Sequence, residues 1–523
     1  MITKIYLKNF RQFQSITIDL NKNKNIFIGS NGTGKSTILS AIDLVLSGSI
    51  KKIENITLES IFNSATILNC IAKKDNLNAT ELPELSIELY LYECGNHKTN
   101  GIHNKEKRVC DGLKLKIIPD EAFLNDILKM LKAKNNKIFP FEFYKIEFKT
   151  FADIPYNSYN KPFKHAYIDS SVASSTFAMK KFIQSNFINV TNDEERARIN
   201  NLYREYGNEF NDKLSTNYKN LILDDYKIIA DSKGENAFSK NISASKNGVY
   251  IEDMGKGEAT LINIQYVLQK YAHDTDLILL EEPENHLSFT NMHKFIDQAE
   301  QYGNQLFIST HNDMIASRLD LTNAIFCHGG QVISLKSLDK NSANFFYKAP
   351  NQKILNFILS PKVILVEGSA EYLLLHYLYV KNYRREPYKD NLSIVECGGL
   401  TSHHYLEIAK LFLNKKVAVA RDNDKNYDSN ITKNYEEYRG ENIEIFSDKS
   451  NDRHTFEICL YEDNSSFYET KIKNAKMTSG VLGFMLKNKV ESAFRAVQEL
   501  EKDSNLSFTT PSYISEAFEW IRK

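Results

Sequence analysis

Hydrophobic and polar residues alternate over the first twenty residues of the chain, which is the pattern of half-buried β-strands. The apolar positions of this alternation are Ile5, Leu7, Ile16, Ile18 and Leu20. A short strand is expected at residues 24–29, followed by a helix over residues 37–46 whose apolar residues recur at helical spacing. A further strand is expected at residues 82–93. The N-terminal part is therefore predicted to mix strands with helices.

Farther along the chain the apolar segments are continuous instead of alternating. Two such strands are expected at residues 277–280 and 306–308, after a helix that begins near Ala259. A second series begins at Lys362, with strands expected at residues 363–366, 393–395 and 416–420. Continuous apolar strands separated by helices are typical of a parallel sheet that is covered on both faces. The pattern therefore predicts an α/β protein with two strand–helix series.

These series indicate the domain boundaries. Residues 1–350 are predicted to form the first α/β domain, residues 361–473 the second, and residues 474–523 a helical C-terminal segment. Residues 110–240 lack a clear strand–helix alternation, so we expect an insertion there in the first domain. The highly charged segment 173–226 within it is predicted to be helical and to pair with another chain.

Composition excludes several classes of protein. The 523 residues are 42% hydrophobic and 25% charged, as in a globular protein, and 66 basic residues balance 66 acidic ones. Nucleic-acid binding must therefore depend on a local basic patch instead of net charge. The six cysteines form no CxxC pair or Cys/His cluster, which argues against a zinc site. No signal peptide or membrane-spanning run is recognisable, so we expect a cytoplasmic protein without a membrane partner.

The segment GSNGTGKS at residues 29–36 fits the phosphate-binding pattern GxxxxGK[ST] at every fixed position. It stands between a predicted strand and a predicted helix, where backbone N–H groups and the helix N-terminus can surround phosphates. Lys35 is expected to reach the β- and γ-phosphates of ATP, and the Ser36 hydroxyl is expected to bind Mg²⁺. The expected nucleotide-binding residues are Gly29, Asn31, Gly32, Gly34, Lys35, Ser36 and Thr37.

The apolar strand at 277–280 ends in the acidic run EEPENHL at residues 281–287. Side chains at the C-terminal end of a buried parallel strand face the ligand crevice. We expect Glu281 to hold Mg²⁺ through water and Glu282 to orient the attacking water. The alternative is an acidic first turn of the next helix, which explains one carboxylate but not three.

A second group of acids follows two strands of the second series. Glu367 ends one strand and Glu371 stands one helical turn later, while Asp422 and Asp424 end another strand. Taken alone, EGxxE is a weak pattern that also fits a strand end followed by a solvated helix. Clustered carboxylates repel one another unless cations neutralise them, and divalent ions with oxygen ligands do this well. A two-metal site of this kind would cleave a phosphodiester.

These motifs together resemble the ABC ATPase domains of the OLD (overcoming lysogenisation defect) family. In that resemblance, the segment MGKGE at residues 254–258 is the signature loop, so Gly255 and Gly257 close on the nucleotide of another subunit. His311 resembles the switch histidine that senses the γ-phosphate; taken alone, it reads as an ordinary strand-end histidine. The chain departs from the pattern at Glu281, where Asp is usual, and no Q-loop glutamine can be placed. These departures predict slow hydrolysis.

The second acid group resembles the TOPRIM domain that follows the ATPase domain in OLD-family nucleases. The resemblance makes Glu367, Glu371, Asp422 and Asp424 metal ligands. It adds the glycine turn Gly398–Gly399, a later acid at Glu457 and a lysine that aids catalysis at Lys489. From the residues alone, the glycines also fit a plain turn, Glu457 a helix surface and Lys489 an exposed lysine.

The resemblance implies a DNA endonuclease that uses Mg²⁺ or Mn²⁺, is controlled by ATP and acts in defence against phage. Because a signature loop completes the site of another copy, the minimum is a homodimer, and the family resemblance extends to a tetramer and to a helicase-like or other defence partner. Two alternatives remain open. One is an ATPase scaffold or sensor with an inactive TOPRIM domain; the other is a DNA-repair ATPase of the RecF or SMC kind, which requires longer heptad arms.

Overall fold

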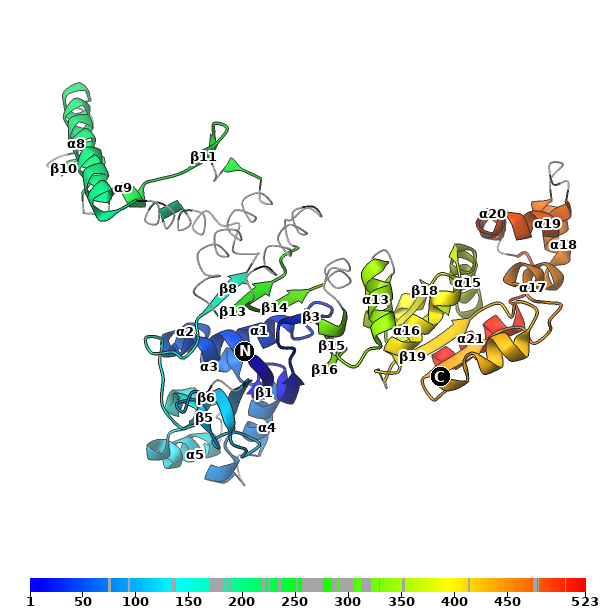
Figure 1. Cartoon of the computed structure of the whole chain (residues 1–523), viewed down its shortest axis with the longest axis horizontal. Coiled ribbons are helices and arrows are strands. Elements are labelled where there is room, and N and C mark those ends of the chain that lie inside the picture. The colour runs from blue at the N-terminus through cyan, green and yellow to red at the C-terminus, as the bar shows by residue number, and fades with distance from the viewer. Residues whose placement is uncertain are drawn as a thin grey trace. The chain divides into compact units, whose positions relative to one another are not determined.

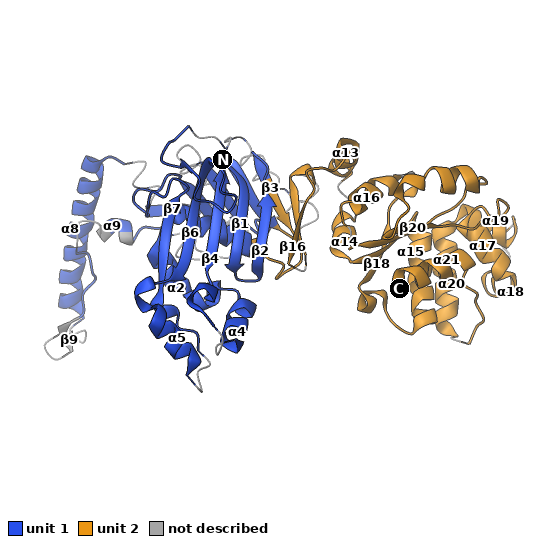
Figure 2. Ribbon diagram, turned by 90° about the horizontal axis from the view of Figure 1, so that it is seen from below, with its two compact units in different colours: residues 1–24, 36–309 blue, residues 25–35, 310–523 orange. Residues whose placement is uncertain are grey.

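The protein is described by a computed structural model that divides into two compact units (Figures 1 and 2). Unit 1 comprises residues 1–24 and 36–309, and unit 2 comprises residues 25–35 and 310–523. The structure describes the whole chain except residues 74–76, 93–94, 134–137, 170–179, 181–182, 185–186, 188–190, 219–221, 224–225, 234–236, 251–252, 256–275, 285–289, 291–300, 302–303, 312–320, 329, 350–352, 413, 474–476, 478 and 504.

The N-terminal part of the chain forms an antiparallel sheet. Its strand order is β2-β1-β4-β6-β5, and β7 pairs with β6. Its strands are β1 (Ile2–Phe10), β2 (Phe13–Asp19), β4 (Leu85–Leu91), β5 (Asn100–Gly101), β6 (Cys110–Pro119) and β7 (Tyr144–Thr150). Ile5 and Leu7 are fully buried, as the alternating pattern predicted. The expected strands near the N-terminus and at residues 82–93 are therefore confirmed.

A second, six-stranded sheet has the order β16-β15-β3-β14-β13-β8. Its strands are β3 (Lys24–Ile28), β8 (His165–Asp169), β13 (Leu277–Glu281), β14 (Gln305–Thr310), β15 (Ala324–His328) and β16 (Gln331–Ser334). The strands β8, β13 and β14 run parallel, and the first four residues of β13 are buried. The continuous apolar runs at 277–280 and 306–308 thus are buried parallel strands, as expected.

The expected insertion at residues 110–240 is narrower in the structure. Residues 110–169 supply β6, β7 and β8, so this stretch belongs to the two sheets and is not inserted between them. Its side chains alternate less clearly because β6 is buried on both faces over much of its length. In the segment 173–226, the described residues include the long charged helix α8 (Asp193–Asn217), which begins at the Asn192 cap.

Short helices and hairpins complete this part of the chain. The helices are α1 (Lys35–Ser47), α2 (Ile50–Ile56), α3 (Leu58–Ile61), α4 (Ser64–Ala72), α5 (Leu124–Lys132) and α9 (Ala237–Lys240). Two small antiparallel pairs are β9 (Ile222–Leu223) with β10 (Tyr226–Lys227), and β11 (Ser245–Lys246) with β12 (Val249–Tyr250). The helix expected from Ala259 lies outside the described residues.

Unit 2 contains a four-stranded parallel sheet with the order β18-β17-β19-β20. The strands are β17 (Lys362–Val366), β18 (Leu392–Glu396), β19 (Lys416–Ala420) and β20 (Ile443–Phe446). The helices of this unit are α13 (Lys340–Lys348), α14 (Ile354–Leu359), α15 (Ser369–Tyr383), α16 (Ser402–Ala409), α17 (Phe456–Asp463), α18 (Ser465–Phe467), α19 (Gly480–Lys487), α20 (Lys489–Lys502) and α21 (Ser512–Arg522). The three expected strands are confirmed.

The C-terminal helices share one hydrophobic core with this sheet. Helix α20 packs on α15, and α21 packs on β19, with Ala517, Phe518 and Ile521 fully buried. The described part of the segment 474–523 consists mainly of α19, α20 and α21, as predicted, and these helices complete the core of the domain that was expected to end at residue 473. Among the helices that the structure describes, none is long and apolar enough to cross a membrane.

Candidate active sites

The predicted phosphate-binding loop connects β3 to α1 (Figure 1). Gly32 and Gly34 have φ angles of 78° and 108°, a region that side chains with a Cβ rarely enter. At Gly29 an added Cβ would lie 2.4 Å from the carbonyl oxygen of Cys327 on β15. The three glycines are therefore required by the backbone path of the loop, whatever it binds.

Lys35 folds back onto this loop. Its Nζ donates hydrogen bonds to the carbonyl oxygens of Gly29 at 2.6 Å and Ser30 at 2.9 Å, and the residue is buried. Thr37, two residues later on α1, donates to Gln12 Oε1 at 2.9 Å. The lysine ammonium is thus held inside the loop, the place where phosphate oxygens would accept its hydrogen bonds.

The C-terminal end of β13 places Glu281 beside a tyrosine that the sequence did not single out. The Tyr167 hydroxyl on the neighbouring strand β8 donates a hydrogen bond to Glu281 Oε2. Burial, together with this carboxylate, raises the pKa of Tyr167 well above its usual range. Arg11, in the turn between β1 and β2, interacts electrostatically with both groups, while burial lowers its pKa. Glu281 therefore has a phenol as a hydrogen-bond donor and a guanidinium as an electrostatic partner.

Glu282 has a left-handed backbone conformation, with φ of 43°. Its N–H donates to the carbonyl oxygen of Ser309 on β14 at 3.0 Å, which fixes this strained turn at the strand end. Strain in a residue that is not glycine is concentrated at functional positions. His311 directly follows β14 and is exposed. Gly255 is exposed, whereas Gly257 and residues 285–287 lie outside the described part of the chain.

The second group of acids lies at the C-terminal edge of the unit 2 sheet. Strands β17 and β19 pair in parallel, with Val366 opposite Ala420, so the residues that follow them emerge at the same edge. Glu367 directly follows β17, and Glu371 lies in the first turn of α15. Asp422 and Asp424 follow β19. The parallel register thus brings together two motifs about fifty residues apart in the sequence.

The glycine turn also belongs to this edge. Gly398 and Gly399 have φ angles of 77° and 55°, and their N–H groups donate to the carbonyl oxygen of Glu367 at 3.1 and 3.3 Å. These two hydrogen bonds therefore hold the backbone of Glu367 beside the end of β18, the strand that precedes the turn.

Two helices bring the remaining predicted residues to the acids. Glu457, in the first turn of α17, is buried, and Lys489 begins α20. Lys489 Nζ lies 2.9 Å from Glu457 Oε2 and 4.0 Å from Asp422 Oδ2. The backbone N–H of Phe456 donates to Asp422 Oδ1 at 2.7 Å. Glu457 is therefore not the helix-surface residue that its sequence context also allowed.

Burial and mutual repulsion disfavour the charged forms of these acids. Burial, followed by the nearby Glu367, raises the pKa of Asp422 to about 8. Burial is also the main cause that raises the pKa of Glu371 to about 7, and Glu457 adds to it. Burial raises the pKa of Glu367, although Arg421 opposes this. Such clusters are concentrated at functional sites because a fold gains no stability from unneutralised buried acids.

The site also contains carboxylate oxygens that no hydrogen bond satisfies. Glu367 Oε1 and Glu457 Oε1 are buried and accept none. Glu457 Oε2 lies 2.9 Å from the Lys489 ammonium, but as an ion pair without hydrogen-bond alignment. Among the described residues, no three His, Cys, Asp or Glu side chains are grouped as a preformed metal site. An all-oxygen donor set with unsatisfied buried lone pairs nevertheless fits a hard divalent cation.

Two family models match the chain. The model of the AAA ATPase domain matches residues 1–316, more than half of the chain. The chain belongs to the AAA ATPase domain family. The model of the TOPRIM domain of overcoming lysogenization defect protein-like proteins matches residues 358–424. This AAA ATPase therefore carries a nuclease-type TOPRIM domain of the OLD-like kind after its ATPase domain, as the resemblance of the motifs indicated.

Relatives of the AAA ATPase include two characterised proteins. Endonuclease GajA of Bacillus cereus (strain VD045) is 24% identical over 448 residues, which are 77% of this chain and 72% of GajA. The DNA replication and repair protein RecF of Lactococcus lactis subsp. lactis (strain IL1403) is 29% identical over 251 residues, which are 46% of this chain and 64% of RecF. The GajA match extends over both domains, whereas the RecF match covers less than half of the chain.

Among solved structures, similar chains include an SMC head domain and part of an OLD protein. The SMC head domain from Thermotoga maritima gives a TM-score of 0.30 at 16% identity and covers 62% of this chain and 94% of that chain. The C-terminal region of the Burkholderia pseudomallei OLD protein gives 0.21 at 17% identity and covers 31% and 97%. TM-scores of this size carry no weight for fold or function.

Sequence reasoning did not predict three residues that lie at these two sites of the AAA ATPase. Arg421 immediately precedes Asp422, and its guanidinium lies among the TOPRIM acids. Tyr167 and Arg11 accompany Glu281. Arg421 could have been found, since a basic residue at the end of an apolar strand breaks the pattern. Tyr167 and Arg11 lie far from Glu281 in sequence and carry no local signal.

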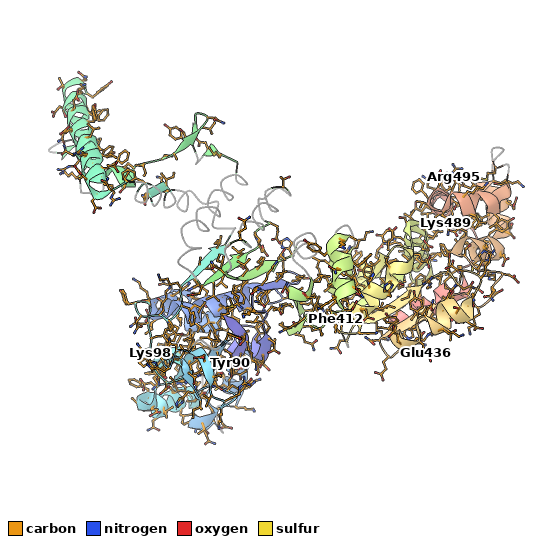
Figure 3. All side chains as sticks on the ribbon, in the orientation of Figure 1. Tyr90, Lys98, Phe412, Glu436, Lys489 and Arg495 are labelled. Carbon is orange, nitrogen blue, oxygen red and sulfur yellow. The ribbon has the colours of Figure 1, made fainter. Side chains whose placement is uncertain are left out.

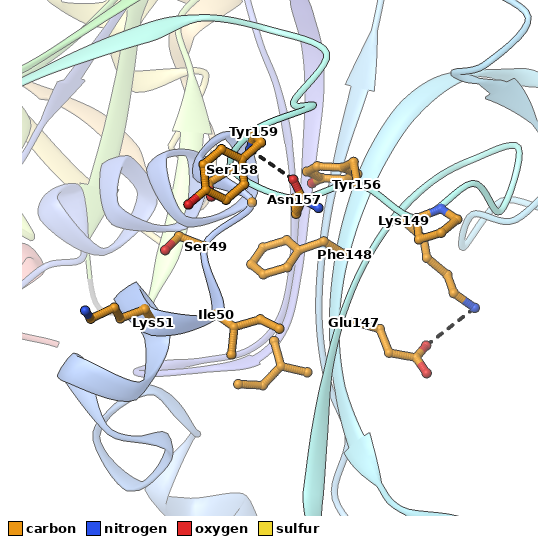
Figure 4. A pocket seen from close by; sticks show the side chains of 13 residues that line it. Ser49, Ile50, Lys51, Glu147, Phe148, Lys149, Tyr156, Asn157, Ser158 and Tyr159 are labelled. Carbon is orange, nitrogen blue, oxygen red and sulfur yellow. Dashed lines mark hydrogen bonds and ion pairs between the residues drawn. The ribbon is translucent and has the colours of Figure 1, made fainter.

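A separate cavity of about 600 Å³ lies in unit 1 (Figure 4). It is lined by the junction of α1 and α2, by β7 and by residues 155–159, including the exposed ring of Tyr159. None of the site residues expected from the sequence lines this cavity. It therefore does not contribute to either candidate site.

Proposed function

We propose that this chain is a DNA endonuclease that depends on divalent metal, is regulated by ATP and acts in the cytoplasm in defence against phage. The observation that carries the proposal is the buried acid cluster at the edge of the TOPRIM sheet, with Asp422 at its centre. Its acids come from two adjacent parallel strands and two helices, an arrangement that folding alone does not require. The similarity to endonuclease GajA across both domains supports the same function.

In the nuclease site we assign Glu367, Glu371, Asp422, Asp424 and Glu457 as the residues that hold Mg²⁺ or Mn²⁺. Bound divalent ions would supply an activated water and stabilise the leaving oxygen of the phosphodiester. Lys489 reaches the acids from the start of α20. Its ammonium lies 2.9 Å from Glu457 and is half exposed, so it neutralises the acids and faces the solvent from which DNA arrives.

In the ATPase site we assign Lys35 to the β- and γ-phosphates, Ser36 and Glu281 to Mg²⁺, and Glu282 to the attacking water. The N–H groups of the loop that includes Asn31 and Thr37 would surround the phosphates. The strained backbone of Glu282 supports its role because strain in a residue that is not glycine is concentrated at functional positions. His311 would sense the γ-phosphate, and Gly255 with Gly257 would approach from another copy.

A homodimer is the minimum assembly for such a shared site, and a tetramer is compatible with it. The described surface of α8 offers a contact. Leu202, Tyr206 and Phe210 are 51%, 64% and 54% exposed and recur every four residues, so they form one apolar stripe along the helix. We assign this stripe to pairing between copies, and leave the assembled surface for a helicase-like or other defence partner.

The decisive experiment is a plasmid-cleavage assay that crosses metal with nucleotide. Supercoiled plasmid is incubated with the full chain in Mg²⁺, Mn²⁺ or EDTA, each with no nucleotide, ATP or a non-hydrolysable analogue. Nicking or linearisation that needs metal and changes with nucleotide supports the proposal. Absence of cleavage in every metal, with intact ATP binding, would instead favour the ATPase scaffold or sensor.

A further inference from the structure

A buried arginine lies within the carboxylate cluster. The side chain of Arg421 is only 6% exposed, and it enters the cluster from the end of β19. Its Nε lies 3.4 Å from Glu367 Oε1, and its Nη2 lies 3.5 Å from Asp424 Oδ2. One guanidinium thus lies between acids that follow two different strands, β17 and β19.

Neutral groups hold this guanidinium in position. Nε donates a hydrogen bond to the backbone carbonyl of Asp422 at 3.2 Å, and Nη1 donates to the Tyr435 hydroxyl. The Tyr435 hydroxyl in turn hydrogen bonds with Ser402 Oγ on α16 at 2.7 Å, and both residues are buried. The planar fork of an arginine loses little freedom when it is anchored in this way.

The contacts of Arg421 with the acids are of a different kind. Both are longer than a normal charge-assisted hydrogen bond, and Glu367 Oε1 accepts no hydrogen bond although it is buried. The guanidinium therefore supplies positive charge to Glu367 and Asp424 without using their lone pairs. These lone pairs stay available to a cation that approaches from the open side.

We propose that Arg421 is a built-in counter-ion of the nuclease site, which keeps Glu367 and Asp424 in place without metal and competes with divalent metal for them. The inference rests on the proposed metal-dependent function. Arg421 is a positioning residue in this scheme, since it acts through the acids. It differs from Lys489, which reaches the acids from α20 with a half-exposed side chain (Figure 3).

Two consequences follow from a fixed positive charge beside metal ligands. Without metal it offsets carboxylate repulsion and stabilises the fold, because like charges confined together repel strongly in a buried site. With metal it repels the incoming cation and weakens binding. Removing the charge should therefore destabilise the metal-free protein and tighten metal binding at the same time. A merely structural arginine would produce only the first effect.

The test is Mn²⁺ binding to the full chain by isothermal titration calorimetry, together with thermal melting in EDTA. Arg421→Gln should bind Mn²⁺ about tenfold more tightly than the unsubstituted protein and melt at a lower temperature in EDTA. The control is Arg439→Gln, in which a partly exposed arginine of the same unit loses its ion pair with Glu444 on β20. It should change neither value. Unchanged or weaker Mn²⁺ binding in Arg421→Gln overturns the proposal.

A second variant decides the question if Arg421→Gln does not fold. Tyr435→Phe removes only the hydroxyl that anchors Nη1, so the charge stays but is less fixed, and Mn²⁺ should bind about two- to threefold more tightly. Unchanged binding then overturns the proposal. If the unsubstituted protein itself binds no Mn²⁺, the metal-dependent function fails. The competition proposed for Arg421 then fails with it, because lower melting in EDTA alone is also what a merely structural arginine produces.

Discussion

The ammonium group of Lys489 lies 2.9 Å from the carboxylate of Glu457, although the two residues lie in the first turns of different helices, α20 and α17. This contact joins the C-terminal helices to the acid cluster of the TOPRIM sheet. The contact forms because α20 packs in the core of that sheet, which places the first residue of this helix beside the acids.

Asp422→Asn should abolish DNA cleavage and leave ATP hydrolysis largely unchanged. Asparagine keeps the oxygen that accepts the Phe456 N–H at 2.7 Å, so the first N–H group of α17 keeps its acceptor, while the negative charge is lost. We expect cleavage to fall by more than about 100-fold. Asp422→Ala should have the same effect on cleavage but also unfold more easily, because it leaves that buried N–H without its acceptor. Plasmid nicking and phosphate release measure the two activities; cleavage that survives in Asp422→Asn contradicts the assignment.

Lys35→Ala should weaken ATP binding by at least about 100-fold, or roughly 3 kcal/mol. The buried ammonium of Lys35 is the positive charge that the loop offers to phosphate. Its hydrogen bonds in the loop go to carbonyl oxygens, which carry no positive charge and cannot replace it when the lysine is removed. Equilibrium binding of a fluorescent ATP analogue measures the loss. Circular dichroism should stay unchanged, because the glycines and not the lysine fix the path of the loop. ATP affinity like that of the unsubstituted protein would show that residues 29–36 are not the nucleotide site.

Glu282→Gln should keep ATP binding and slow hydrolysis by on the order of 10²–10⁴-fold, the usual contribution of a general base. Glutamine can adopt the same strained backbone, with its N–H still bonded to the Ser309 carbonyl, so only the charge changes. The slow variant should accumulate as an ATP-bound dimer, which size-exclusion chromatography with light scattering detects. If turnover stays normal, Glu284 is the next candidate for the base.

Paired charges on the exposed stripe of α8 should prevent dimer formation. Tyr206→Asp with Phe210→Asp places two acids in the apolar contact that we assign to pairing. The matched control, Asn201→Asp with Asn208→Asp, adds the same charge on the opposite face of the helix, since residues advance by about 100° each. Sedimentation should show that the mass of the particle is halved only in the variant that carries Tyr206→Asp and Phe210→Asp. Equal masses for both variants would show that the dimer contact does not lie on this stripe of α8.

The stability of unit 2 should depend on pH through Lys415. Burial lowers the pKa of this lysine from 10.5 to about 7, and its Nζ donates to the carbonyl oxygens of Phe357, at 2.7 Å, and Ser360. Between pH 7 and 10.5 the unfolded chain binds the proton that the folded chain has released, so stability rises with pH by about 1.4 kcal/mol per unit. Below pH 7 the destabilisation is fully present.

Lys415→Met has no amine that titrates at this position, so its stability should not depend on pH through residue 415. Between pH 7 and 9, the melting temperature of the unsubstituted protein should therefore rise by a few degrees relative to that of Lys415→Met. The neighbouring Lys416→Met, at a partly exposed position, controls for loss of an amine. Differential scanning calorimetry of the full chain measures both. A difference that stays constant with pH would show that Lys415 remains charged in the fold.

The sequence by itself determined the local elements and the chemistry at their ends. A glycine-rich loop between a strand and a helix has few other uses, and acids directly after apolar strands must emerge at an edge of a parallel sheet. Residues 29–36, Glu281 and Glu282, and the acids from Glu367 to Asp424 could be proposed as site residues for that reason. Each depends on neighbours within a few residues, and such short-range patterns are visible in a linear chain.

Only the tertiary structure decided which distant side chains meet these residues. Tyr167 reaches Glu281 because β8 pairs with β13. The pairing of β6 with β4 and of β7 with β6 likewise places the other strands of residues 110–169 in a sheet, where an insertion was expected. Lys489 reaches Glu457 because α20 packs into the TOPRIM core, and Tyr435 holds Arg421 through a loop after β19. Strand pairing and core packing join residues many positions apart. Their outcome depends on the burial of the whole domain, which no local pattern of polar and apolar residues records.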